Sequence, residues 1–279
     1  TTSYLVPVST RRLLLNERNM RYWHVLLLGL LASPAAAERP NSVLILCDDL
    51  GYSDVGFNGA DDIETPQLDQ LARDGTVFRS AYVVHPFCGP SRMGLMTGRY
   101  PHAFGAPFNL PETGDGNEEY YNQGIDVDET LISTVLQRAG YYTGAIGKWH
   151  MGTAPQFHPN ARGFDDYYGF LGGGHKYFPQ QYRAAYEKQL EAGVERIWDY
   201  LTPLQHNGKE VRETEYLTDA LSGEAVRFIT AAAEKKQPFF LYLAYNAPHT
   251  PLEAKKEDIE RFAGITDKKR RTYAGMVYA

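Results

Sequence analysis

Three short apolar segments, each followed directly by polar or charged residues, limit most strongly what this chain can fold into. They span residues 42–47, 141–146 and 238–245. Their length and their content of β-branched and aromatic residues are typical of strands buried in a parallel sheet. Apolar residues with helical spacing lie around them, at residues 65–75, 128–140 and 216–233. This alternation predicts an α/β fold with a mostly parallel central sheet flanked by helices.

The segments between these elements carry weaker patterns. Residues 76–78 and 81–84 are apolar enough to be short strands, and residues 91–97 are predicted to begin a helix. Gly, Pro, Asn and aromatic residues dominate residues 101–125 and 152–210, which lack strong periodicity. These two segments are therefore predicted to be loops around a site.

The N-terminal part of the chain has the pattern of a secretory signal peptide over residues 20–37. A basic residue, Arg21, precedes the apolar run 25–32, and the small residues 35–37 form an A-x-A cleavage signal. The run is too short to span a bilayer, so the pattern predicts export to the periplasm or the extracellular space without a stable membrane span. Residues 1–19 precede the first Met and are predicted to be an upstream extension outside the fold.

The two cysteines of the chain, Cys47 and Cys88, are predicted to remain unpaired. An even number of cysteines in an exported protein is compatible with a disulfide bond. However, Cys47 lies inside the first predicted strand, and Cys88 lies in a motif that suggests chemistry. The same strand ends at Asp48 and Asp49, whose carboxylates could hold a hard divalent cation or could simply form a solvated turn.

The motif around Cys88 is C-x-P-x-R, formed by residues 88–92, and it occurs together with four further patterns. These are P-N-(apolar strand)-D-D-x-G-Y, L-M-T-G-R-Y-P, G-K-W-H-M-G and A-P-H-T-P, at residues 40–52, 95–101, 147–152 and 247–251. In this order they resemble the type I sulfatase family of the alkaline-phosphatase-like superfamily, and in particular bacterial exported arylsulfatases and N-acetylgalactosamine-6-sulfatase-like enzymes. The resemblance runs from about residue 39 to the end of the chain.

The resemblance implies a nucleophile made from Cys88. In this family a maturation enzyme oxidises the cysteine to formylglycine, and the hydrate of that aldehyde attacks the sulfur of a sulfate ester. Asp48, Asp49 and the modified Cys88 would be ligands of Ca²⁺, or of Mg²⁺. The implied activity is that of a sulfuric ester hydrolase, acting on a sulfated carbohydrate or an aryl sulfate.

Five further residues take roles from the same resemblance. Arg92 would hold the hydrated aldehyde, and His150 would be the base that assists release of sulfate. Lys148 and His249 would bind the sulfate group. His175 follows three glycines and either lines a sugar subsite or packs a loop; the sequence leaves both alternatives open.

The chain also departs from the family pattern. Family members carry a second acidic pair, Asp-Asn, and a further lysine downstream, which complete the site. Residues 38–279 are therefore expected to be the N-terminal part of a sulfatase catalytic domain without its C-terminal subdomain, and inactive by themselves. Two alternatives remain: a phosphatase or phosphonate monoester hydrolase of the same superfamily, and a non-catalytic glycan-binding relative. The net charge of −6 gives no indication of a nucleic-acid partner.

Overall fold

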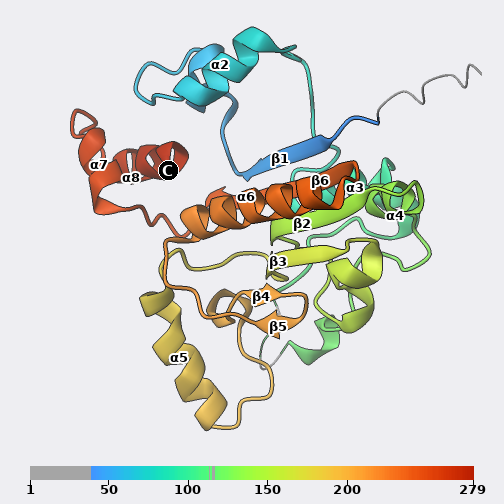
Figure 1. The fold of residues 1–279 in the computed structure, drawn as a ribbon. Helices are drawn as coiled ribbons and strands as arrows, with labels where there is room; N and C mark the ends of the chain where they lie inside the picture. The colour runs from blue at the N-terminus through green and yellow to red at the C-terminus, as the bar shows by residue number, and fades with distance from the viewer. Residues whose placement is uncertain (1–38, 113, 115–116) are drawn as a thin grey trace, which may run out of the picture. The chain divides into compact units, whose positions relative to one another are not determined.

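A mixed β-sheet of six strands organises the described part of the chain in the computed structural model, which covers residues 39–112, 114 and 117–279. The strands follow the spatial order β1-β6-β2-β3-β4-β5 (Figure 1). Their bounds are β1 Ser42–Asp48, β2 Tyr142–Lys148, β3 Asp166–Phe170, β4 Gln205–His206, β5 Lys209–Glu210 and β6 Phe239–Pro248. The first four strands in this order are parallel, and β4 and β5 add a short antiparallel edge.

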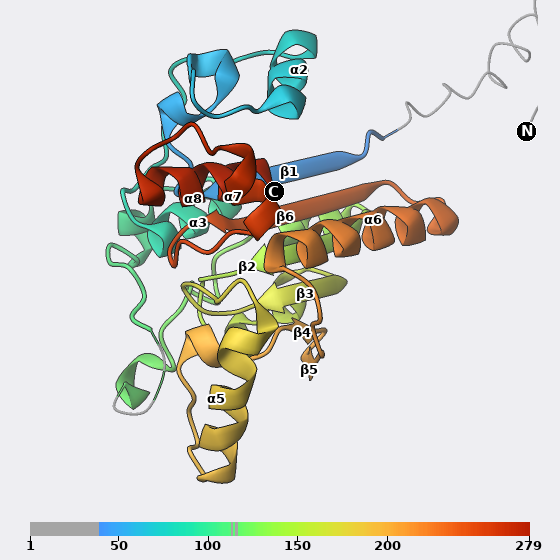
Figure 2. The ribbon, with the colours of Figure 1, turned by 90° about the vertical axis from the view of Figure 1, so that its left-hand side faces the viewer.

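Helices cover both faces of the sheet (Figures 1 and 2). The α-helices are α2 Pro66–Asp74, α3 Cys88–Thr97, α4 Ile132–Arg138, α5 Pro179–Glu191, α6 Leu217–Lys235, α7 Lys256–Arg261 and α8 Lys268–Tyr278. The 3₁₀ helices are η1 Tyr52–Asp54, η2 Gly56–Asn58, η3 Pro101–Phe104, η4 Glu118–Tyr120, η5 Pro155–Phe157, η6 Pro159–Arg162 and η7 Asp199–Leu201. None of the helices in the described part of the chain is long and apolar enough to cross a membrane.

Alternating side chains of the central strands point into two separate cores, as the pleat of a strand requires. On one face Leu241 and Leu243 of β6 pack with apolar residues of α6, including Phe228. On the other face Phe240 and Tyr242 pack with residues of α3 and of the segments around it. The central strands are therefore apolar on both faces, which explains why they were recognisable in the sequence.

The predicted α/β class and the mostly parallel sheet are confirmed, and so are the three strands that define it. The helix expected from residue 91 begins three residues earlier, at Cys88. The prediction of unpaired cysteines is also confirmed, because Cys47 and Cys88 both carry free thiols in the described structure. The predicted signal peptide and upstream extension lie outside the described residues.

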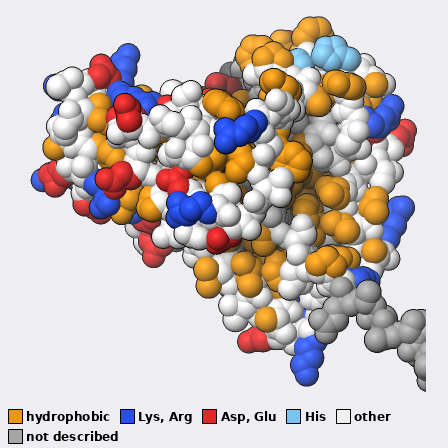
Figure 3. Space-filling model, turned by 90° about the horizontal axis from the view of Figure 1, so that it is seen from above, with side chains coloured by type: hydrophobic (Ala, Val, Ile, Leu, Met, Phe, Trp, Pro, Cys, Tyr) orange, Lys and Arg blue, Asp and Glu red, His pale blue; other side chains and the backbone are white. Residues whose placement is uncertain are grey.

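Three predictions about the fold are wrong. The first strand is not buried, because β1 lies at one edge of the described sheet and leaves Val43 and Ile45 44% and 50% exposed. Exposed hydrophobic side chains gather on the face that Figure 3 shows. Residues 76–78 and 81–84 form no strand, and their side chains are largely exposed. Residues 152–210, expected to be loops, contain β3, α5, β4 and β5.

Candidate active site

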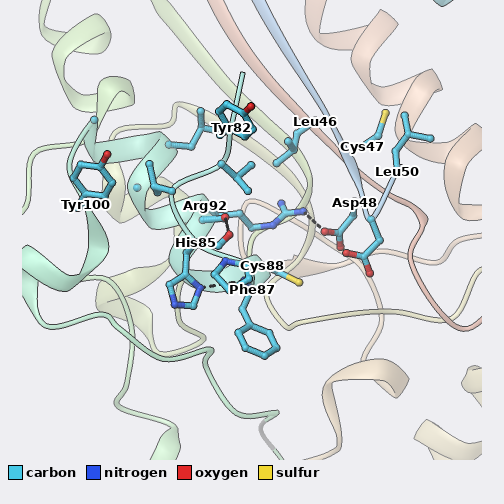
Figure 4. A pocket seen from close by; sticks show the side chains of 18 of the residues that line it. Leu46, Cys47, Asp48, Leu50, Tyr82, His85, Phe87, Cys88, Arg92 and Tyr100 are labelled. Atoms are coloured by element: carbon cyan, nitrogen blue, oxygen red, sulfur yellow. Dashed lines mark hydrogen bonds and ion pairs between the residues drawn. The ribbon is translucent and has the colours of Figure 1, made fainter. Parts of the chain in front are cut away.

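The carboxyl ends of β1, β6 and β2 lie side by side, and the polar residues that follow them meet at this edge of the sheet. Asp48 ends β1, Lys148 ends β2 and His249 follows β6 directly. Helix α3 brings Cys88 and Arg92 to the same place. A cavity of about 670 Å³ lies at this point, and Asp48, Cys88 and Arg92 are among the residues that line it (Figure 4). This is the position at which parallel α/β sheets collect ligand-binding groups.

Cys88 is the first residue of α3, where the helix dipole favours negative charge. Burial raises the pKa of its thiol, but a hydrogen bond with His249 and the charge of Lys148 outweigh burial and lower this pKa overall. The turn is held in place by Asn109, whose Oδ1 accepts a 3.0 Å hydrogen bond from the amide of Gly89. Cys88 is thus a partly accessible, activated group in a fixed position.

Two buried cations flank the carboxylate of Asp48. Arg92 lies 3.2 Å away through one guanidinium nitrogen, and the Nζ of Lys148 lies 2.5 Å away. Arg92 also donates to the carbonyl of Lys148 at 2.8 Å and to the hydroxyl of Tyr242 at 3.0 Å. Burial raises the pKa of Asp48, but the two cations lower it overall, so the carboxylate is charged. The cluster has one positive charge in excess, which favours an anionic ligand.

The two histidines of the site have their pKa values shifted in opposite directions. Burial, with the charges of Lys148 and Arg92, lowers the pKa of His150 to about 3, so its ring is neutral. Its Nε2 lies 3.3 Å from the carbonyl of Leu110. Burial lowers the pKa of His249, but its hydrogen bond with Cys88 outweighs burial and raises this pKa overall. Such a pair can divide the roles of base and acid.

Part of a divalent-cation site is present next to the cavity. Ligand atoms of Asp48, Cys88 and His249 all lie within 4.8 Å of one another. The other predicted ligand, Asp49, is exposed, and its Oδ2 lies 3.7 Å from Nε2 of His249. Two adjacent carboxylates beside position 88 suit a hard cation, although they supply fewer than the roughly six to eight oxygens that Ca²⁺ takes. The residues therefore fit such an ion as part of its ligand set.

The glycine run 172–174, which precedes His175, is explained by packing. A Cβ added at Gly173 would lie 2.9 Å from Nε2 of His150, and one added at Gly174 would lie 2.3 Å from the hydroxyl of Tyr200. His175 itself is buried, and its two ring nitrogens each lie 2.7 Å from a backbone carbonyl, of Lys176 and Thr202. Of the two alternatives for His175, this geometry favours loop packing.

Several residues that shape the site were missed in the sequence. Asn109 and Leu110 lie in a segment without periodicity, and Leu110 acts through its backbone carbonyl, which leaves no signal in the sequence. Tyr242 was assigned only to the core of β6, yet its hydroxyl holds Arg92. The only signal in the sequence for these residues is that Asn109 is a polar side chain two residues after Pro107.

The fold and the site together define an α/β protein of the alkaline-phosphatase-like superfamily. Residues 40–279 match the protein family described as Sulfatase. The chain belongs to this family.

Similar proteins agree with this assignment. Mouse N-acetylgalactosamine-6-sulfatase is 36% identical over 235 residues, which are 82% of this chain and 44% of the mouse protein. Dog Arylsulfatase G is 34% identical over 231 residues, 77% of this chain and 41% of that protein. The crystal structure of Ps i-CgsB in complex with k-i-k-neocarrahexaose has a TM-score of 0.82 and 61% identity, covering 86% of this chain and 52% of that one. The chain thus spans less than half the length of these curated relatives.

Proposed function

We propose that the protein carrying this chain hydrolyses sulfate esters on a sulfated glycan. The observation that carries this proposal is the excess positive charge buried around Asp48, directly beside the accessible Cys88. A sulfate ester is a compact anion, and two fixed cations would stabilise the charge that develops on its oxygens during transfer. Membership of the sulfatase family supports the same reaction.

The substrate class follows from the relatives. The mouse relative is named for a sulfate on N-acetylgalactosamine, and the Ps i-CgsB structure contains k-i-k-neocarrahexaose. Because identity to Ps i-CgsB reaches 61%, we infer a sulfated oligosaccharide related to this ligand as the substrate.

Two groups would complete the reactive centre. A maturation enzyme would convert Cys88 to formylglycine and supply the oxidant for that step. Asp48, Asp49 and the oxygen at position 88 would hold Ca²⁺ or Mg²⁺. The cation would lower the pKa of the hydroxyl at position 88 and neutralise sulfate oxygens.

The chain's own residues would bind the sulfate and move its protons. Lys148 holds a sulfate oxygen as a point charge, and Arg92 keeps the start of α3 fixed against β2. His249 gives a proton to the alcohol oxygen that leaves when its bond to sulfur breaks. His150, whose ring is kept neutral by burial, would accept the proton of the second hydroxyl at position 88 as sulfate departs. The sum is one ester and one water converted to an alcohol, sulfate and a proton.

The decisive experiment compares an aryl sulfate with the matching aryl phosphate, using enzyme produced together with a maturation enzyme. We expect turnover of the sulfate to exceed that of the phosphate, and to vanish in Cys88→Ala while the variant stays folded. Mass spectrometry of the peptide containing Cys88 reports its conversion to the aldehyde. Faster turnover of the phosphate would favour a phosphatase, and an unmodified thiol with glycan binding but no turnover would favour a binding protein.

A further inference from the structure

A pair of stacked aromatic side chains stands at the start of η7. The rings of Trp198 and Tyr200 lie 4.7 Å apart between centroids, with their planes 17° from parallel. Trp198 is 39% exposed, whereas the other tryptophan in the described residues, Trp149, is 1% exposed. One face of the indole is thus backed by Tyr200, and the side chain keeps a large surface open to solvent.

The indole is fixed by the segment that follows α3. Its Nε1 donates a 2.6 Å hydrogen bond to Oε2 of Glu112. Two residues before Glu112, the carbonyl of Leu110 lies 3.3 Å from Nε2 of His150. The segment that orients Trp198 therefore also touches a residue of the candidate active site.

Tyr200 is connected to the same histidine from another direction. Gly174 lies so close to Tyr200 that an added Cβ would be 2.3 Å from the hydroxyl. The preceding residue, Gly173, lies against the ring of His150, where an added Cβ would be 2.9 Å from Nε2. Burial, followed by the negative charges of Glu112, Cys88 and Asp48, raises the pKa of Tyr200 to about 12. The phenol is therefore close enough to the catalytic groups to experience their charge.

We propose that Trp198, Tyr200 and Glu112 form a subsite for the sugar ring next to the sulfated one. The apolar C–H face of a sugar packs on an aromatic ring, while its hydroxyls bond to polar groups at the rim. Here the polar group at the rim is the carboxylate of Glu112, which repels a sulfate group. The sugar ring bound at this subsite therefore carries no sulfate on the side that faces Glu112. This inference rests on the proposed function and specifies its substrate.

Fluorescence titration of the protein carrying this chain with k-i-k-neocarrahexaose tests the subsite, because a sugar on Trp198 changes the emission of that indole. We expect a saturable change that is lost in Trp198→Phe, while calorimetry shows that this variant keeps its affinity within about threefold because its ring still stacks. Trp198→Ala is expected to weaken binding about fivefold to tenfold, the size of one aromatic contact. Phe78→Ala, at another exposed aromatic residue, serves as the matched control and should bind normally.

The outcomes separate this inference from the proposed function. If the oligosaccharide binds and Trp198→Ala binds it equally well, the subsite is wrong and the sulfatase proposal stands. If the oligosaccharide does not bind at all, the subsite is also wrong. The aryl sulfate assay of the protein carrying this chain then decides the proposed function, because a substrate with no second sugar does not use Trp198.

Discussion

Replacement of Asp48 by Asn would leave two buried cations without a counter-charge. Asp48, Arg92 and Lys148 are 6%, 2% and 1% exposed, so water cannot compensate the loss. Breaking a buried ion pair by removing one partner costs about 3–5 kcal/mol of the free energy of unfolding. Lys148→Met should cost less, because Asp48 keeps Arg92 at 3.2 Å and the surplus positive charge disappears. We expect the loss of one charge-assisted hydrogen bond, below about 2 kcal/mol.

Urea denaturation in metal-free buffer at neutral pH, followed by circular dichroism, measures both variants without interference from a bound cation. Lys255→Met is the matched control, because Lys255 pairs with Asp219 at 2.9 Å near the surface and should lose at most about 1 kcal/mol. The expected order of loss is Asp48→Asn, then Lys148→Met, then Lys255→Met. If Lys148→Met costs as much as Asp48→Asn, the excess of positive charge in the cluster is not real and the argument for an anion site fails.

Three further predictions follow from packing, pH and metal binding. Gly174→Ala should lose about 1–3 kcal/mol of stability, because its Cβ would clash with the hydroxyl of Tyr200. Gly223→Ala is the matched control: a Cβ there meets open space, so this variant should gain about 0.4–1 kcal/mol. Thermal melts compare the two variants. Burial raises the pKa of Asp166, but hydrogen bonds, first of all from Arg227, lower it overall, so Asp166→Asn should destabilise by about 1–3 kcal/mol at neutral pH. The difference in stability between wild type and Asp166→Asn should shrink as the pH falls below about 4 and through the folded-state pKa of Asp166. Denaturant titrations at several pH values measure this difference, and a difference that stays constant or grows at low pH would contradict the prediction. Ca²⁺ at a hundredfold excess over its Kd should stabilise the wild type by about 2.7 kcal/mol, and Asp48→Asn should show no such gain in a calcium-dependent melt.

The sequence predicted the strands that are apolar along their whole length and failed where a strand depends on its neighbours. β3 reads Asp-Tyr-Tyr-Gly-Phe, which has neither alternation nor an apolar run, yet all five residues are buried. This segment is a strand because it pairs in parallel with β2. The two backbones come so close at Gly169 and Gly147 that a Cβ on Gly169 would lie 2.1 Å from the carbonyl oxygen of Gly147. β1 was expected to be buried because its composition is that of a central strand, and composition does not reveal position in the sheet.

The candidate site was predictable to the extent that its residues follow strands or stand in motifs. Asp48, Lys148 and His249 end up together because the strands that precede them are parallel neighbours. Leu110 was not predictable, because it acts through its backbone. Nor was Tyr200, which lies in a segment without periodicity and reaches the site only through tertiary packing against Trp198 and the glycine run.

The position of β6 between β1 and β2 has a consequence for the order of events during synthesis. Phe240 of β6 pairs with Ser42 of β1 on one side and with Thr143 of β2 on the other, so β1 and β2 cannot come together before β6 exists. About 150 residues separate Cys88 from Phe239, the start of β6. At about 5–20 residues per second, the ribosome needs roughly 8 to 30 seconds to make them. During this interval the sheet beside Cys88 is incomplete, so the modification proposed for this residue would have time to occur before folding encloses the site.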